Sequence, residues 1–263
     1  MTRSVEARLL IRAAADTAYV FAGAVARGYS LTDELLTFRL DGAAVARTEL
    51  AEGAGRLQVF SAGAGELEIR YRAEVEGRPL PAPADALDAV RYVRPSRYCE
   101  SDALSPVARE QFAGLAGAEL AFAVTGWVHD RLSYVPRSTA SGDGAIATLE
   151  KREGVCRDYA HLTAALLRAM DMPARVVAVY APQLEPMDFH AVVEAMIEGR
   201  WYVFDATGLA PRTGLVRIAT GRDAADTAFL SNTLADVQLL ELEVRAAASE
   251  QLRDEGAELI ELA

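Results

Sequence analysis

The chain has 263 residues, of which 27 are lysine or arginine and 38 are aspartate or glutamate, so its formal net charge is −11. This acidic balance argues against nucleic acid or an anionic membrane as a partner, because both bind a basic protein face. Although 51% of the residues are hydrophobic, no uncharged stretch approaches the roughly 18 apolar residues of a membrane span.

The two cysteines, Cys99 and Cys156, are too few for a disulfide framework or a cysteine-based metal site. The N-terminal stretch carries acidic residues within its apolar part and lacks a small-residue cleavage site, so it does not resemble a signal peptide. The closely spaced aspartates and asparagines of a calcium loop are also missing. We therefore expect a cytoplasmic protein with reduced thiols, no metal and no cofactor.

Residues 1–80 are predicted to form a β-sandwich-like accessory domain. Segments 35–42, 49–63 and 65–75 alternate apolar with polar residues and are separated by turns that contain glycine. In segment 65–75, four apolar and four charged side chains fall on opposite faces, which is typical of a half-buried antiparallel strand. The apolar face holds Leu67, Ile69, Tyr71 and Ala73, and the charged face holds Glu66, Glu68, Arg70 and Arg72.

Residues 77–87 carry three of the ten prolines and are predicted to be a linker, within a lead-in that covers residues 81–105. Residues 106–133 have the apolar spacing of a helix, and a lone histidine there, His129, is interpreted as structural or solvent-facing. The core is expected to cover residues 106–230. The remaining residues, 231–263, form a C-terminal extension to which the sequence assigns no role.

A helix is predicted from about Cys156 to Met170, after a Ser-, Gly- and Pro-rich loop at 133–145 and a short helix that ends near Gly154. The positive end of the helix dipole and its free N–H groups favour a thiolate at Cys156. His161 is five residues further on, about 140° around the helix, so it points away from the thiol. We interpret His161 as a packing or hydrogen-bonding residue.

Residues 187–208 are predicted to form a hairpin that turns at Glu198-Gly199. In this register His190 and Asp205 lie on the same face as diagonal neighbours, within reach of a hydrogen bond. Asp188 is the alternative acid for the histidine, whereas Glu194 shares the face but lies about 13 Å along the strand. The opposite face is almost wholly apolar and is expected to face the core. It holds Ala191, Val193, Ala195, Ile197, Tyr202, Phe204 and Ala206.

The run GVCRDYAHL, followed about 30 residues later by DFHAVVEAMIEGRWYVFDATG, resembles the bacterial transglutaminase-like superfamily, a branch of the papain-like cysteine enzymes. The resemblance covers roughly residues 90–225. It implies an α+β fold in which a cysteine-bearing helix packs on an antiparallel sheet. It also implies a catalytic triad of Cys156 as nucleophile, His190 as general base and acid, and Asp205 as the residue that orients the histidine.

The activity that this resemblance implies is acyl transfer from a peptide or isopeptide amide through a thioester, as a protease or amidase. Two alternatives stay open, an enzyme that transfers the acyl group to an amine and an inactive binding or scaffold protein on the same fold. The glutamine that papain-like enzymes use as an oxyanion donor is replaced by Glu150, which cannot donate when ionised. Tyr134, Arg157 and Trp201 are the candidates for the oxyanion or substrate site.

Overall fold

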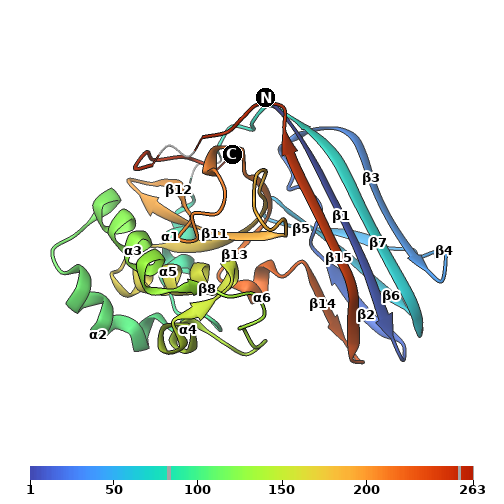
Figure 1. Cartoon of the computed structure of the whole chain (residues 1–263), viewed down its shortest axis with the longest axis horizontal. Helices are drawn as coiled ribbons and strands as arrows, with labels where there is room; N and C mark the ends of the chain where they lie inside the picture. Colours follow the sequence, from blue (N-terminus) through green and yellow to red (C-terminus); the bar gives the residue numbers. More distant parts are fainter. Residues whose placement is uncertain (82–83, 254–255, 263) are drawn as a thin grey trace.

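The computed structural model describes residues 1–81, 84–253 and 256–262, so residues 82–83 of the expected linker lie outside the described residues. Figure 1 shows two long-stranded sheets on one side of the molecule and a helix-covered sheet on the other. The predicted α+β fold class, with a β-sandwich-like part built largely from the N-terminal residues, is confirmed.

The sandwich consists of a five-stranded sheet in the order β15-β1-β7-β3-β4 and a four-stranded sheet in the order β14-β2-β6-β5. All of their pairings are antiparallel. The strands are β1 (Thr2–Ala13), β2 (Thr17–Phe21), β3 (Ser30–Leu40), β4 (Ala43–Ala44), β5 (Thr48–Glu52), β6 (Gly55–Ala62), β7 (Gly65–Glu76), β14 (Leu230–Thr233) and β15 (Val237–Ala248).

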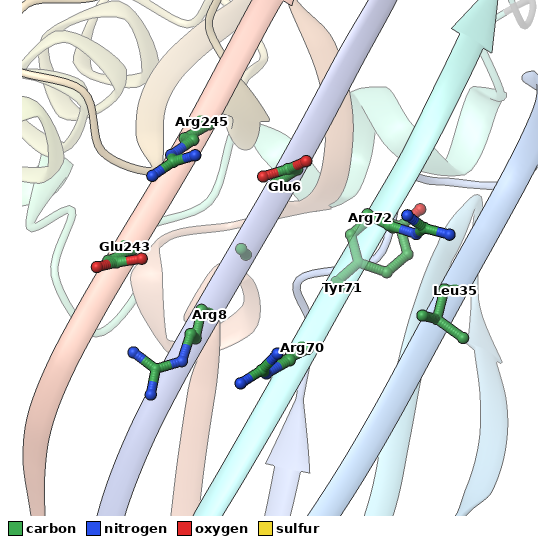
Figure 2. A pocket seen from close by; sticks show the side chains of 9 residues that line it. Glu6, Arg8, Leu35, Arg70, Tyr71, Arg72, Glu243 and Arg245 are labelled. Atoms are coloured by element: carbon green, nitrogen blue, oxygen red, sulfur yellow. The ribbon is translucent and has the colours of Figure 1, made fainter.

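The outer face of the five-stranded sheet carries alternating charges, and Figure 2 shows arginine and glutamate side chains side by side on β15, β1 and β7. Arg8 contacts Glu68 at 2.8 Å and Glu241 at 2.6 Å, and Arg70 also contacts Glu68. On the inner face Leu67, Ile69, Tyr71 and Ala73 are buried. The face assignment predicted for segment 65–75 is therefore confirmed.

The C-terminal residues complete the sandwich, which the sequence did not indicate. β15 pairs with β1 over almost its whole length, from Arg3 opposite Ala248 to Ala13 opposite Val237. Residues 256–262 then return to the core sheet, where the N–H of Val203 donates to the carbonyl of Ile260 at 2.8 Å. A pairing between the two ends of the chain depends on long-range packing, which local periodicity does not report.

The second part is an antiparallel four-stranded sheet in the order β12-β11-β10-β13. Its strands are β10 (Ala174–Tyr180), β11 (His190–Ile197), β12 (Arg200–Phe204) and β13 (Val216–Gly221). Helix α5 (Cys156–Ala169) packs on this sheet and is almost wholly buried beyond its first two residues. The other helices are α1 (Ala86–Tyr92), α2 (Ser101–Phe112), α3 (Gly117–Arg131), α4 (Ala145–Lys151), α6 (Ala224–Thr227) and the 3₁₀ turn η1 (Arg212–Gly214).

The expected helical stretch at 106–133 is two helices rather than one. α2 ends at Phe112 and α3 begins at Gly117. Between them Gly114 has a φ of 84° and Gly117 a φ of 53°, conformations that glycine adopts at little cost and that end a helix. Both helices pack on α5. Among the described residues, no helix is long and apolar enough to cross a membrane.

Candidate active site

The thiol of Cys156 lies at the first turn of α5, where the sequence predicted it. The side chain is partly exposed, and its Sγ contacts the carbonyl oxygen of Phe189 at 3.9 Å. Asp158 accepts a hydrogen bond from the N–H of Val155 at 2.8 Å and so caps the helix. The N–H of Cys156 lies in the first turn of the helix, where no helical carbonyl accepts its hydrogen bond.

His190 is the first residue of β11. Its ring bonds to Asp205, and the thiol of Cys156 contacts the carbonyl of Phe189, the preceding residue. Its Nε2 lies 2.7 Å from Oδ2 of Asp205. Nδ1 of the ring is buried and has no hydrogen-bond partner among the described residues. Since Nε2 is engaged by Asp205, Nδ1 is the nitrogen available to the thiol. The side chains of His190 and Asp205 are only 1% and 3% exposed, so water does not weaken the pair.

The charge state of His190 is set by this pair. Burial alone would lower the pKa of His190, but the negative charge of Asp205, the hydrogen bond to Asp205 and the neighbouring Cys156 raise it to about 10. The imidazole is therefore protonated at neutral pH. A cation in this position stabilises a thiolate on the neighbouring cysteine.

Asp205 directly follows β12 and is fixed by a residue to which the sequence assigned no role. Oδ1 of Asp205 accepts from the N–H of Thr207 at 2.9 Å and from its hydroxyl at 2.7 Å. Burial would raise the pKa of Asp205, but His190 and these bonds hold it below its usual value. The only signal in the sequence was the short polar spacing Asp-Ala-Thr, which favours such a side-chain turn.

The hairpin has the predicted register. Ile197 pairs with Arg200, Met196 with Trp201 and Val193 with Phe204. The predicted apolar face contacts the core beneath α5. The opposite face is buried as well, because Val192 and Val203 pack against residues 260–262.

Tyr134 lies beside the thiol, as expected for an oxyanion candidate. It belongs to β8 (Ser133–Tyr134), which pairs in parallel with β9 (Glu153–Gly154) just before α5. Burial and the nearby acidic groups raise the pKa of Tyr134 to about 12, against a smaller opposite effect of the backbone of Cys156. A tyrosine in this state keeps its proton and can donate it in a hydrogen bond.

The other two candidates lie elsewhere, which corrects the sequence prediction. Nη2 of Arg157 donates to the carbonyls of Ala140 and Asp143, at 3.1 and 3.0 Å. Trp201 lies 4.0 Å from the guanidinium of Arg175 and pairs with Met196, about 20 Å along β11 from His190. Strand periodicity gave the correct face for Trp201 but not its distance from the site.

Two acidic side chains considered from the sequence do not bond to the histidine. Glu150 is exposed on α4. Asp188 accepts a hydrogen bond through Oδ1 from the N–H of Phe189, at 2.7 Å. Asp205 is therefore the acid that contacts His190. Within residues 1–81, 84–253 and 256–262, no group of three or more His, Cys, Asp or Glu side chains could hold a metal ion.

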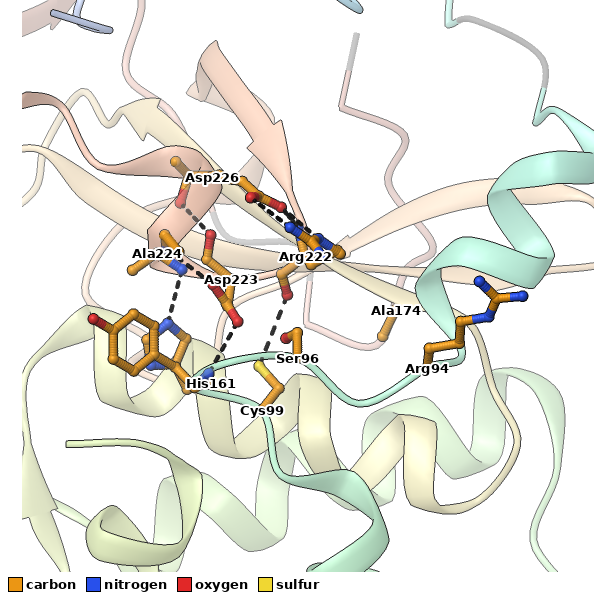
Figure 3. A network of polar contacts seen from close by, with 12 residues as sticks. Arg94, Ser96, Cys99, His161, Ala174, Arg222, Asp223, Ala224 and Asp226 are labelled. Carbon is orange, nitrogen blue, oxygen red and sulfur yellow. Dashed lines mark hydrogen bonds and ion pairs between the residues drawn. The ribbon is translucent and has the colours of Figure 1, made fainter. Parts of the chain in front are cut away.

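His161 is buried away from the thiol, in agreement with its predicted packing role. Figure 3 shows it beneath the turn at 223–226, where its Nε2 accepts from the N–H of Ala224 at 3.1 Å. Its ring stacks on Tyr98 with 5.2 Å between centroids. His129 is exposed, and its Nδ1 lies 2.9 Å from the carbonyl of Ala206.

Stability should fall in mild acid partly because of His161. Burial, with the nearby Arg157, lowers the pKa of His161 from 6.5 to about 3. Between these values the unfolded chain binds a proton that the folded chain does not, so stability is lost as the pH falls. The free energy of unfolding at pH 5 should therefore be about 2 kcal/mol lower than at pH 7 because of this residue.

Urea unfolding at pH 7 and pH 5 measures this effect. We expect His161→Gln to show a smaller loss between the two pH values than the wild type. The control His129→Gln removes an exposed imidazole. It should lose as much free energy of unfolding between pH 7 and pH 5 as the wild type does. An unchanged pH dependence in His161→Gln contradicts the assignment.

Comparisons with known proteins agree with this geometry. The family model of the transglutaminase-like superfamily matches residues 107–206, which hold Cys156, His190 and Asp205. The crystal structure of a protein named as a putative cysteine protease, from Cytophaga hutchinsonii, superposes with a TM-score of 0.87. The two chains are 32% identical, and the alignment covers 95% of this chain and 91% of that chain.

Two further relatives are more distant or match a shorter segment. The uncharacterized protein ML0607 of Mycobacterium leprae (strain TN) is 34% identical over 116 residues, and the match spans 40% of each protein. The periplasmic domain of TgpA from Pseudomonas aeruginosa, solved with ethylmercury bound, is 22% identical with a TM-score of 0.43. That alignment covers 75% of this chain and 91% of the other.

Proposed function

The chain belongs to the transglutaminase-like superfamily, and on this basis we propose that it is a cysteine-dependent enzyme that cleaves peptide or isopeptide amides through a thioester. The observation that carries the proposal is the 2.7 Å contact of His190 with Asp205, together with the thiol of Cys156 held at the carbonyl of Phe189, the residue just before His190. Nucleophile, base and orienting acid within hydrogen-bond reach are what such chemistry requires.

In the proposed reaction the thiolate of Cys156 attacks the amide carbon. The imidazolium of His190 gives its proton to the amide nitrogen, so the amine leaves and a thioester forms. His190, now neutral, takes a proton from water, whose oxygen attacks the thioester. The C–S bond then breaks, which releases the carboxylic acid and restores the thiolate and imidazolium. Asp205 keeps its charge and holds the ring in position throughout.

The negative charge that develops on the amide oxygen needs hydrogen-bond donors. The N–H of Cys156 is one, because an N–H in the first turn of a helix has no helical carbonyl four residues before it to accept its hydrogen bond. The hydroxyl of Tyr134 is the proposed second donor, since its raised pKa keeps it protonated and the backbone of Cys156 is near enough to influence it. Removal of one such donor typically costs about 100- to 1,000-fold in kcat.

Product analysis tests the proposed function. The protein is incubated with a mixture of peptide amides and a labelled primary amine, and products are identified by mass spectrometry. We expect free carboxylic acids as the main product with the wild type and none with Cys156→Ala. A main product that carries the label supports an amine-accepting acyltransferase instead. No product from the wild type, although its Cys156 is reactive, supports the scaffold alternative.

Thr207 is predicted to act through Asp205 as a positioning residue. Thr207→Val keeps the shape of the side chain but removes the hydroxyl that donates to Asp205. A hydrogen bond to a charged group contributes about 1.5–3 kcal/mol, so we expect kcat to fall about ten- to a hundredfold. Thr207→Ser keeps the hydroxyl and should retain nearly full kcat. If the serine variant is as slow as the valine variant, the hydroxyl does not position Asp205.

The proposed partner is a peptide or protein substrate, and the proposed location is the cytoplasm. Both cysteines are free thiols, and the reaction needs Cys156 in its reduced form, which a reducing compartment maintains. Cell fractionation with an antibody to the protein checks the location. Recovery outside the cytoplasmic fraction would contradict it.

A further inference from the structure

A second carboxylate lies at the thiol but takes no part in the proposed reaction. The contact between Sγ of Cys156 and the carbonyl of Phe189 brings segment 188–190 against the nucleophile. Asp188 begins this segment, and its side chain is exposed at the rim of the site. Its charge acts on the hydroxyl of Tyr134, and His190 in turn acts on the carboxyl of Asp188. The carboxylate is therefore close to the reacting groups.

Only one of the two oxygens of the Asp188 carboxylate has a hydrogen-bond partner. Oδ1 of Asp188 accepts from the N–H of Phe189 at 2.7 Å. In the part of the chain that the structure describes, Oδ2 has no hydrogen-bond partner, and no lysine or arginine forms an ion pair with the side chain. Because the side chain is exposed, this second oxygen can accept a hydrogen bond from a cationic group of a bound substrate, and such a charge-assisted bond is stronger than a neutral one.

We propose that Asp188 determines substrate specificity by binding a primary ammonium group next to the amide that is cleaved. This inference rests on the proposed function. A single free oxygen suits an ammonium, which is a compact charge that binds one acceptor. A guanidinium suits it less, because its paired donors need both carboxylate oxygens. The ammonium can come from a free α-amino group or from a lysine side chain.

Matched peptide amides test the proposal. One pair differs by a free or an acetylated N-terminus, and one set places lysine, arginine or norleucine at the same position. With Asp188→Asn we expect kcat/KM to fall about tenfold for peptides with an ammonium and less than twofold for neutral ones. Asparagine retains an oxygen for the N–H of Phe189. A loss confined to the peptide with a free N-terminus identifies an α-amino group as the bound ammonium. A loss confined to the lysine peptide identifies a lysine side chain.

Equal losses for neutral and cationic peptides overturn the proposal. Asp102→Asn is the control for net charge, because it removes the same charge from an exposed position on α2. It should leave the preference for an ammonium unchanged. A preference lost equally in both variants would mean that overall charge, and not Asp188, attracts the substrate.

A second measurement does not depend on turnover. Aminoethyl and hydroxyethyl methanethiosulfonate both modify a thiol. The first carries an ammonium group and the second a neutral hydroxyl in its place. We expect the ratio of their rates at Cys156 to fall several-fold in Asp188→Asn and to be unchanged in Asp102→Asn. An unchanged ratio in Asp188→Asn overturns the inference. Because this assay involves no amide, a shifted ratio without peptide cleavage means that the proposed function fails and the ammonium site stands.

Discussion

Replacing His190 with alanine is expected to lower kcat for amide cleavage by at least about a thousandfold. The variant loses the proton donor for the leaving amine and the cation that stabilises the thiolate of Cys156. Asp205 loses its partner as well, and its charge would be left uncompensated in the buried site. Steady-state kinetics on the best peptide amide found by product analysis give the value.

The control is Arg109→Ala, which removes an exposed cationic side chain on α2 that contacts Asp171, beyond the end of α5 opposite Cys156. It should keep kcat within about twofold of the wild type. Thermal unfolding of both variants shows whether the fold is intact. If folded His190→Ala retains more than about a tenth of the wild-type kcat, the imidazole is not the general base.

Replacing Glu194 with glutamine is expected to lower the free energy of unfolding by about 3–5 kcal/mol. The side chain is fully buried, and its two oxygens accept from Arg217 at 2.7 and 3.0 Å and from Arg175 at 2.6 Å. Burial would raise the pKa of Glu194, but the two arginines hold it below its usual value. Glutamine has nearly the same shape but leaves Arg217 without its counter-charge, while Arg175 keeps only Asp88, 3.7 Å from its Nη1.

Urea unfolding at neutral pH measures this change. Glu110→Gln serves as control, because Glu110 is exposed on α2 and its replacement should change stability by less than about 0.5 kcal/mol. A loss below about 1 kcal/mol for Glu194→Gln would show that water or rearranged side chains compensate the arginines. The pair Glu194–Arg217 would then contribute little to stability.

The elements that carry the site could be predicted because their signals are local. The apolar spacing after Cys156 and the proline at 173 define α5 within one residue of its observed end. Alternation along 190–206 and the turn at Glu198-Gly199 define the register, which in turn puts His190 and Asp205 on one face. Two short-range patterns thus predicted most of the geometry of the site.

What could not be predicted depends on contacts between distant segments. β15 pairs with β1 across more than 220 positions, and Arg217 reaches Glu194 from another strand. Trp201 shares a face with His190, yet the face alone does not say how far apart two residues lie. The role of Thr207 was missed because a threonine that follows a strand is usually only a turn residue.

The division into segments 1–80, 81–105, 106–230 and 231–263 stays a prediction. One hydrophobic cluster joins Tyr71 and Phe21 of the sandwich to Tyr180 and Phe189 of the core. Phe189 also provides the carbonyl that contacts the thiol. Packing between the two parts therefore supports the segment that positions Cys156 and His190.

Alkylation of the two cysteines by iodoacetamide near pH 6.5 tests the central claim most directly, because it reports whether the thiol of Cys156 shares a proton with His190. Cys99 is fully buried, and burial raises its pKa to about 12, so it should react slowly. We predict that Cys156 reacts at least about a hundredfold faster than Cys99, and that His190→Asn removes most of this advantage. Equally slow reaction of both cysteines, or an unchanged rate at Cys156 in His190→Asn, would contradict the account.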